Sequence, residues 1–148
     1  AWCARELGGR VTSVDHSAEK LALAAANLKR AGLDGFVDLE CGDATEVIGS
    51  LEGPFDFVLF DSVQVQPHLQ LGPLLPKLAD DALVLADNVL SHPEGLAPFL
   101  AIIDAQPDFD RVVVPVGKGL CVAHRLAPSL AAAGMKRGRQ LPNPAGLC

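Results

Sequence analysis

Short apolar runs alternate along the chain with longer segments in which apolar residues recur every three or four positions. Runs of the first kind predict buried strands, and segments of the second kind predict helices with one apolar face. The run 55–60 is apolar except for Asp56, as is typical of a parallel strand that is covered on both faces. In the segment 17–31 the apolar residues follow helical spacing, Ser17 suits an N-terminal cap, and Gly32 suits a C-terminal cap.

The order of the predicted elements indicates a fold class. The expected strands are 11–14, 36–40, 55–60, 82–86, 111–116 and 120–125, and the expected helices are one that ends at Gly8 and Gly9, 17–31, a short helix to about Leu51, 67–79 and 94–105. This order predicts an α/β fold with a Rossmann-like, mainly parallel sheet, helices on both faces and a C-terminal antiparallel hairpin. We expect residues 1–125 to form the domain and residues 126–148 to form a flexible tail.

Composition excludes several classes of protein. Hydrophobic residues make up 49% of the 148 residues, which excludes a disordered chain. The net charge of −6 argues against nucleic-acid binding, and no apolar run is long enough to span a bilayer. The four cysteines form no C-x-x-C pair, which disfavours a zinc site or a disulfide framework and fits a reducing, cytoplasmic location. Cys41 and Cys121 lie in apolar runs, so we expect both in the core.

Aspartates stand at or just after the ends of consecutive predicted strands, namely Asp15, Asp43, Asp61 and Asp87. In an open α/β sheet, ligands bind just beyond the carboxyl ends of the strands, so these carboxylates are expected to line one rim. Each aspartate could instead cap the helix that follows it. For a single aspartate the two roles are equally plausible, but the repetition along the chain favours a binding site.

Asp15 and Asp43 have positions that suit nucleotide binding. A carboxylate at the end of the strand 11–14 can accept hydrogen bonds from both hydroxyls of a ribose, in NAD or in S-adenosylmethionine. Asp43 could accept a hydrogen bond from the exocyclic amine of an adenine, and Gly42 would let the backbone come close to the ring.

Asp61, Asp87 and Asn88 form a second group, which offers two carboxylates and one amide. Such hard oxygen ligands suit Mg²⁺, Ca²⁺ or Mn²⁺ rather than zinc. A vicinal diol on a substrate could fill open positions on the ion, and the ion would lower the pKa of a bound hydroxyl. Asn88 could alternatively be no more than a turn residue.

Several segments together carry a resemblance to a known family. They are 11–17 (VTSVDHS), 41–44 (CGDA), 55–61 (FDFVLFD), 83–90 (LVLADNVL) and 112–123 (VVVPVGKGLCVA). In this order they resemble the class I S-adenosylmethionine-dependent O-methyltransferases of the catechol and caffeoyl-CoA type. The resemblance extends over most of the chain, up to about Arg125, and its most specific piece is the Asp87–Asn88 pair taken together with Asp61.

The resemblance implies S-adenosylmethionine as cofactor, with Mg²⁺ or a similar divalent cation. It places Asp15 at the ribose, Asp43 near the adenine, and the cation on Asp61, Asp87 and Asn88. It also implies a small phenolic or catechol-like acceptor, and the family is often dimeric, so a homodimer is expected. The residues expected around the cofactor are Asp15, His16, Gly42, Asp43, Ala44 and Asp61.

The sequence lacks the family's first strand and its glycine-rich loop, which contacts the methionine end of the cofactor. Because that strand lies in the middle of the family's sheet, the strands that end at Asp15 and Asp61 are expected to have unpaired edges. We therefore expect residues 1–148 by themselves to bind the cofactor weakly.

Many family members also have a lysine shortly after the metal-binding aspartate, which acts as general base. Here Asp61 is followed by Ser62, Val63 and Gln64, and an amide takes up no proton at neutral pH. His68 is the candidate substitute, because an unperturbed imidazole has a pKa near neutrality. It could equally be a histidine on a helix surface.

The leading hypothesis is an enzyme that moves a methyl group from S-adenosylmethionine to an oxygen of a small acceptor. A nicotinamide-dependent oxidoreductase shares the ribose aspartate and the order of elements, but it leaves the group of Asp61, Asp87 and Asn88 unexplained. A non-catalytic, degenerate domain is the third hypothesis, which the missing loop and the missing lysine support.

Overall fold

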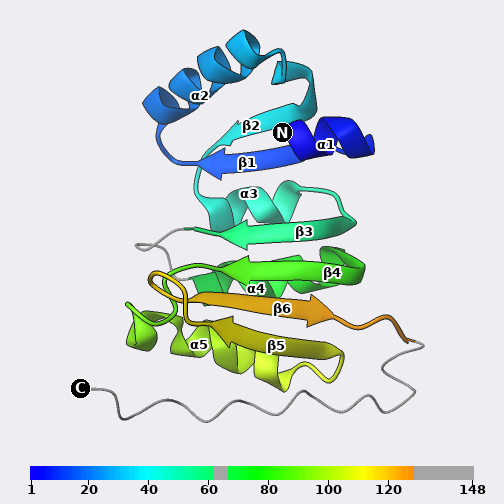
Figure 1. Cartoon of the computed structure of the whole chain (residues 1–148), viewed down its shortest axis with the longest axis vertical. Helices are drawn as coiled ribbons and strands as arrows, with labels where there is room; N and C mark the ends of the chain where they lie inside the picture. The colour runs from blue at the N-terminus through cyan, green and yellow to red at the C-terminus, as the bar shows by residue number, and fades with distance from the viewer. Residues whose placement is uncertain (62–66, 129–148) are drawn as a thin grey trace. The chain divides into compact units, whose positions relative to one another are not determined.

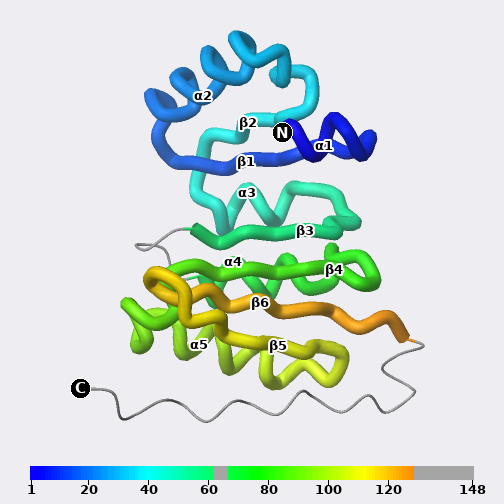
Figure 2. Tube along the Cα trace, viewed as in Figure 1, coloured from blue at the N-terminus to red at the C-terminus, as the bar shows by residue number. Residues whose placement is uncertain are grey.

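The computed structural model describes residues 1–61 and 67–128 of the chain. It divides into two compact units, Ala1–Leu51 and Glu52–Cys148. Figure 1 labels the helices and strands of both units, and Figure 2 traces the chain through them. Each unit contains a sheet of its own.

The first unit is a pair of parallel strands with helices connected to them. Strands β1 (Val11–Asp15) and β2 (Val37–Cys41) pair in parallel, so that Asp15 lies opposite Cys41. The remaining elements are α1 (Trp2–Leu7), α2 (Ala18–Ala31), the 3₁₀ turn Asp34–Phe36 and α3 (Ala44–Ser50).

Local signals in the sequence explain the ends of α2 and the start of the sheet. The Ser17 side chain accepts a hydrogen bond from the backbone N–H of Lys20, and Gly32 ends the helix with a φ of 66°. The Arg10 guanidinium donates to both oxygens of Asp38, at 2.6 and 3.0 Å, and thereby links the start of β1 to β2. The predicted N-terminal cap Ser17 and C-terminal cap Gly32 of α2 are both confirmed.

The second unit contains a four-stranded sheet in the order β3-β4-β6-β5. Strands β3 (Phe55–Phe60) and β4 (Leu78–Ala86) are parallel, whereas β6 (Leu120–Arg125) is antiparallel to β4 and to β5 (Phe109–Val114). Its helices are α4 (Pro67–Leu74), the 3₁₀ turn Leu75–Lys77 and α5 (Pro93–Ala105). The α/β fold class and the terminal hairpin are confirmed.

Helices α4 and α5 lie together on one face of this sheet, where the core forms (Figure 1). The Phe99 side chain of α5 is fully buried, and its ring meets that of Phe60 edge-on, with centroids 5.3 Å apart. On this side the two central strands contribute Ala82, Val84, Ala86, Cys121 and Ala123, all fully buried.

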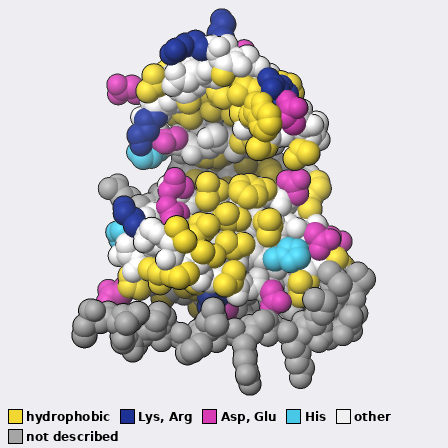
Figure 3. Space-filling model, viewed as in Figure 1, with side chains coloured by type: hydrophobic (Ala, Val, Ile, Leu, Met, Phe, Trp, Pro, Cys, Tyr) yellow, Lys and Arg dark blue, Asp and Glu magenta, His cyan; other side chains and the backbone are white. Residues whose placement is uncertain are grey.

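The other face of the four-stranded sheet is apolar and exposed. Phe57, Leu59, Leu83 and Val112 each expose between 38% and 55% of their surface. Figure 3 shows hydrophobic side chains gathered over these strands. In this unit the described helices therefore cover the face opposite to these residues.

The structure corrects several predicted boundaries. The helix expected to reach residue 79 ends at Leu74, because Pro76 has no N–H to continue the α-helical bonding, and the 3₁₀ turn Leu75–Lys77 follows. Strand β4 begins at Leu78 rather than residue 82, and Asp81 within it takes a φ of 62°. Strand β5 spans Phe109–Val114 rather than 111–116, and β2 spans Val37–Cys41 rather than 36–40.

The two cysteines expected in the core have different surroundings. Cys121 is fully buried, and burial raises the pKa of its thiol to about 11. Cys41 is exposed, so the prediction for it was wrong. The reason is that a two-stranded sheet buries little, since in residues 1–51 only Leu21 and Ile48 are buried.

The expectation of unpaired edges is confirmed within the described residues. β1 pairs only with β2, and β3 pairs only with β4.

None of the helices in residues 1–61 and 67–128 is long and apolar enough to cross a membrane. Of the tail expected at 126–148, residues 129–148 lie outside the described part of the chain.

Candidate functional site

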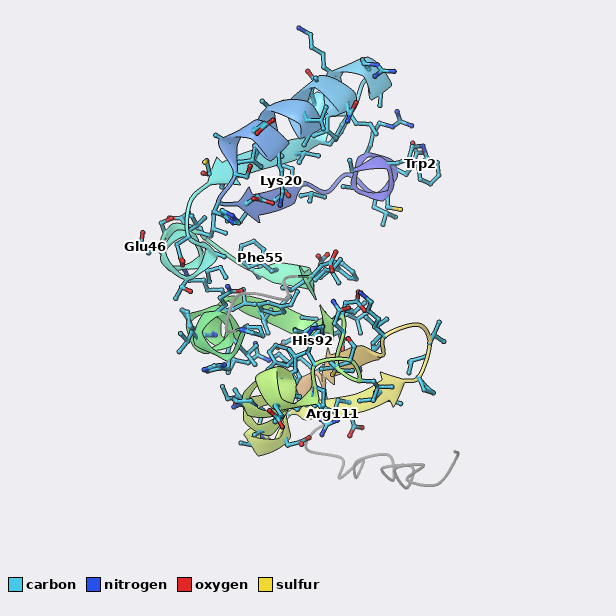
Figure 4. All side chains as sticks on the ribbon, turned by 90° about the vertical axis from the view of Figure 1, so that its left-hand side faces the viewer. Trp2, Lys20, Glu46, Phe55, His92 and Arg111 are labelled. Carbon is cyan, nitrogen blue, oxygen red and sulfur yellow. The ribbon has the colours of Figure 1, made fainter. Side chains whose placement is uncertain are left out.

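The predicted site residues lie where parallel strands end, in two groups, one in each unit. Figure 4 shows the second unit from the side toward which the arrows of β3 and β4 point in Figure 1. The first unit carries the residues expected at the cofactor except Asp61, which lies in the second unit with the other residues expected at the cation. Ligands of open α/β sheets bind at such strand ends.

Asp15 is the last residue of β1, and its carboxylate is held by its neighbours. Its Oδ1 accepts a hydrogen bond of 2.8 Å from the backbone N–H of Ser17, and the Lys20 Nζ lies 3.8 Å from its Oδ2. The hydrogen bond from Ser17 chiefly, with the nearby charges of Lys20 and His16, lowers the pKa of Asp15 below its ordinary value. The carboxylate is therefore ionised at neutral pH and keeps lone pairs for further hydrogen bonds.

Asp43 caps helix α3, as the alternative to a binding role anticipated. Its Oδ1 accepts a hydrogen bond of 2.7 Å from the backbone N–H of Thr45, and this bond lowers the pKa of Asp43. A carboxylate can accept several hydrogen bonds, so capping leaves it able to accept one from a ligand.

The structure brings the candidate cofactor residues of the first unit together. The backbone N–H of Gly42 donates to the carbonyl of Asp15 at 3.2 Å, and the Cys41 Sγ lies 3.9 Å from the carbonyl oxygen of His16. A Cβ on Gly42 would come within 3.0 Å of the Val47 side chain, which leaves little room for another residue. The group so formed comprises Asp15, His16, Gly42, Asp43 and Ala44.

Asp61 and Asp87 follow the adjacent parallel strands β3 and β4 in the second unit. The backbone N–H of Asp87 donates to the carbonyl of Phe60 at 3.0 Å, which sets Asp87 beside the residue that follows Phe60. The Asp87 Oδ1 accepts a hydrogen bond of 2.8 Å from the backbone N–H of Asn88. Asn88 is 6% exposed and has a φ of 67°, a conformation that asparagine tolerates better than most residues.

The donor chemistry of this group suits a hard cation. Two carboxylates and an amide at neighbouring strand ends supply oxygen ligands of the kind that Mg²⁺ binds. In residues 1–61 and 67–128, no three His, Cys, Asp or Glu side chains come together as a metal site.

The hairpin turn between β5 and β6 holds the loop that follows Asn88. The carbonyl of Gly119 accepts from the N–H of Val89 at 3.1 Å, and the carbonyl of Lys118 accepts from those of Leu90 and Ser91 at 2.9 and 3.2 Å. Sequence reasoning assigned this turn only to the hairpin. These contacts are between backbone groups, so the residue types in the sequence do not predict them.

The histidines of the second unit differ in their surroundings. His68, the predicted base, is the second residue of α4, and its Nδ1 is buried without a hydrogen-bond partner in the described structure. Ser62, Val63 and Gln64, on which the missing-lysine argument rests, lie outside the described residues. His92, which sequence reasoning passed over, lies 2.9 Å through its Nδ1 from the Ser91 Oγ.

The fold is similar to those of solved methyltransferase structures. A methyltransferase structure from Geobacter sulfurreducens aligns with 80% of this chain and 59% of that one, with a TM-score of 0.67 and 28% identity. The O-methyltransferase from Bacillus cereus, in complex with SAH, aligns with 80% of this chain and 63% of that one. Its TM-score is 0.72 and its identity 22%, which shows the fold alone. The fold is thus that of the Rossmann-like methyltransferases.

The chain belongs to the methyltransferase domain family, whose model matches residues 1–89. It is 30% identical over 96 residues to the catechol O-methyltransferase of Niastella koreensis, and 29% identical over 92 residues to that of Mycobacterium tuberculosis. Each alignment covers 60% of this chain, and they cover 43% and 42% of the respective relatives. The chain thus spans less than half the length of these relatives.

Proposed function

We propose that the protein methylates an oxygen atom of a small phenolic acceptor, with S-adenosylmethionine as methyl donor and a divalent cation as assistant. The observation that supports this proposal is the arrangement at the ends of β3 and β4, where Asp61, Asp87 and the buried Asn88 lie at neighbouring strand ends. The family to which the chain belongs, and its catechol O-methyltransferase relatives, support the methyl transfer and weigh against the oxidoreductase hypothesis.

The residues of the first unit would hold the methyl donor. The Asp15 carboxylate, kept ionised by Ser17, would accept hydrogen bonds from the ribose hydroxyls. Asp43 would accept one from the adenine amine, while His16, Gly42 and Ala44 would line the same region. Once bound, S-adenosylmethionine supplies a methyl group on a positively charged sulfur.

The residues of the second unit would hold the acceptor oxygen. Asp61, Asp87 and Asn88 would hold a divalent cation, which would lower the pKa of a hydroxyl bound to it. The protein would therefore contribute position and charge at the developing phenolate. His68 stays a prediction as the group that takes the proton, as do the homodimer and the extent of the domain, 1–125.

The first prediction concerns Asp15 and pH. In the protein at its full natural length, Asp15→Ala should weaken S-adenosylmethionine binding about 10- to 100-fold, because charged hydrogen bonds to the ribose are lost. The pKa of Asp15 is lowered, so the carboxylate persists above its folded pKa and is lost as pH falls through it. Affinity should stay constant from about pH 8 to pH 5 and fall only below about pH 4.

Calorimetric titration at several pH values measures this, with circular dichroism to verify that the protein stays folded. Glu19→Gln, which removes an exposed charge from the next helix, is the matched control and should bind normally. A loss of affinity centred near neutral pH would contradict the role given to Asp15.

A further prediction concerns residues 1–148 alone. They should bind S-adenosylmethionine more weakly than micromolar, since β1 and β3 are edge strands of separate sheets.

The test of the proposed function is methyl transfer itself. The full-length protein is incubated with S-adenosylmethionine and catechol, with and without Mg²⁺, and the monomethylated product is measured by mass spectrometry. Product that depends on Mg²⁺ supports the proposal. Equal amounts of product in the presence of a chelator would show that methyl transfer needs no divalent cation, and would contradict this part of the proposal.

A further inference from the structure

We propose that His92 recognises the methyl acceptor by accepting a hydrogen bond from its second hydroxyl through Nε2. The proposal rests on the proposed function and adds a specificity residue to it. His92 is exposed and immediately precedes α5, on the loop that follows Asp87 and Asn88. Figure 4 labels it at the end of the second unit where β4 finishes.

A chain of hydrogen bonds determines which ring nitrogen of His92 carries the proton. The Ser91 hydroxyl donates to the carbonyl of Asn88 at 3.2 Å, and the same oxygen lies 2.9 Å from the His92 Nδ1. Both contacts are satisfied at once only when the hydroxyl donates its single hydrogen to the carbonyl and accepts from Nδ1–H, so we assign the ring proton to Nδ1. The Nε2 of the neutral ring is then left with a lone pair and can only accept.

The backbone holds this pair beside the candidate cation ligands. The N–H of His92 donates to the carbonyl of Asn88 at 3.0 Å, and the N–H of Ser91 donates to the carbonyl of Lys118 at 3.2 Å. The methyl acceptor would have one oxygen at the cation held by Asp61, Asp87 and Asn88. Its neighbouring groups would then lie near the loop that carries His92. A ring that accepts through Nε2 selects a group that donates, such as a hydroxyl.

The ring of His68, the other candidate histidine of this unit, has no hydrogen bond in the described residues comparable to that of His92. Its Nδ1 is buried, and none of the described residues gives it a hydrogen-bond partner. His92 makes no side-chain hydrogen bond that caps α5, so substituting it removes no cap from that helix. His92 can therefore be changed with little effect on the fold.

The test compares a phenolic diol with its monomethoxy counterpart, catechol against 2-methoxyphenol, in the full-length protein. Both acceptors are assayed at the same pH. The ratio of kcat/KM for the two acceptors should fall about tenfold in His92→Phe, which cannot accept a hydrogen bond. It should be largely kept in His92→Gln, whose amide oxygen can accept one. His124→Phe, which changes a histidine on β6, should leave the ratio unchanged.

An unchanged ratio in His92→Phe, or an equal loss on both acceptors in both His92 variants, would overturn the proposal. Failure of the wild-type protein to methylate either acceptor would instead refute the proposed function, and this inference with it. Nitrogen-15 chemical shifts of the ring give a readout that needs no turnover. His92 should carry its proton on Nδ1, and Ser91→Ala should release this preference. A proton on Nε2 in the wild-type protein would contradict the assignment.

Discussion

Replacing Asp87 with alanine should lower Mg²⁺-dependent methyl transfer about 100- to 1000-fold and weaken binding of the divalent cation. The expected loss reflects several kcal/mol of stabilisation that the cation gives to the developing charge, at about 1.4 kcal/mol for each tenfold change in rate. The Asp87 carboxylate has a second task, since its Oδ1 accepts the hydrogen bond from the N–H of Asn88. Alanine removes both the ligand and this hydrogen bond.

A second variant separates the two tasks of Asp87. Asp87→Asn keeps an oxygen that can accept from Asn88 but removes the negative charge. If the charge binds the cation, Asp87→Asn should lose Mn²⁺ affinity, measured by electron paramagnetic resonance, nearly as severely as Asp87→Ala. Asp80→Ala, an exposed aspartate toward the other end of β4, is the control and should behave as wild type. Normal Mn²⁺ affinity in Asp87→Asn would show that the residue serves only to shape the turn.

Gly119→Ala should destabilise the protein by about 2–5 kcal/mol. A Cβ at this position would lie 2.4, 2.8 and 2.9 Å from the Cγ, Cβ and Cδ1 of Leu90, and Gly119 has a φ of +86°. Overpacking costs about 1–3 kcal/mol, and a left-handed conformation costs a non-glycine residue about 1–2 kcal/mol. The close Leu90 Cβ belongs to the base of the side chain, so a change of rotamer cannot relieve the contact.

Gly117→Ala is the matched control for this prediction. Gly117 lies in the same turn with a φ of +59°, but nothing lies within 4 Å of a Cβ placed there. It should therefore cost only about 1–2 kcal/mol, the conformational part alone. Urea denaturation of both variants gives the free energies of unfolding, and hydrogen exchange should show faster exchange at Leu90 and Ser91 in Gly119→Ala. Equal destabilisation by the two variants would contradict the account of the packing.

The sequence predicted best the features that depend on nearby residues. Ser17, Gly8 and Gly32 cap helices as expected, and the apolar run 55–60 is strand β3 with the expected bounds. The placement of aspartates at strand ends was predictable because the end of an apolar run marks the end of a buried strand. Asp43 illustrates the limit of this reasoning, since the same position serves as a helix cap.

Features that depend on distant residues or on backbone geometry were missed. The polar pair Asp80 and Asp81 concealed the early start of β4, because the strand continues through an irregular segment in which Asp81 has a positive φ. The contacts of Lys118 and Gly119 with the loop after Asn88 join backbone groups across the sheet. The proton position assigned to the His92 ring depends on the Ser91 hydroxyl, which also contacts the carbonyl of Asn88.

The most direct test of the central claim is transfer of an isotopically labelled methyl group from S-adenosylmethionine to catechol by the full-length protein. We predict that the label appears on a catechol oxygen in the presence of Mg²⁺, and that a chelator or Asp87→Ala suppresses it. Binding of S-adenosylmethionine without transfer to catechol would contradict the proposed acceptor and cation. Absence of both binding and transfer would contradict the methyltransferase activity itself.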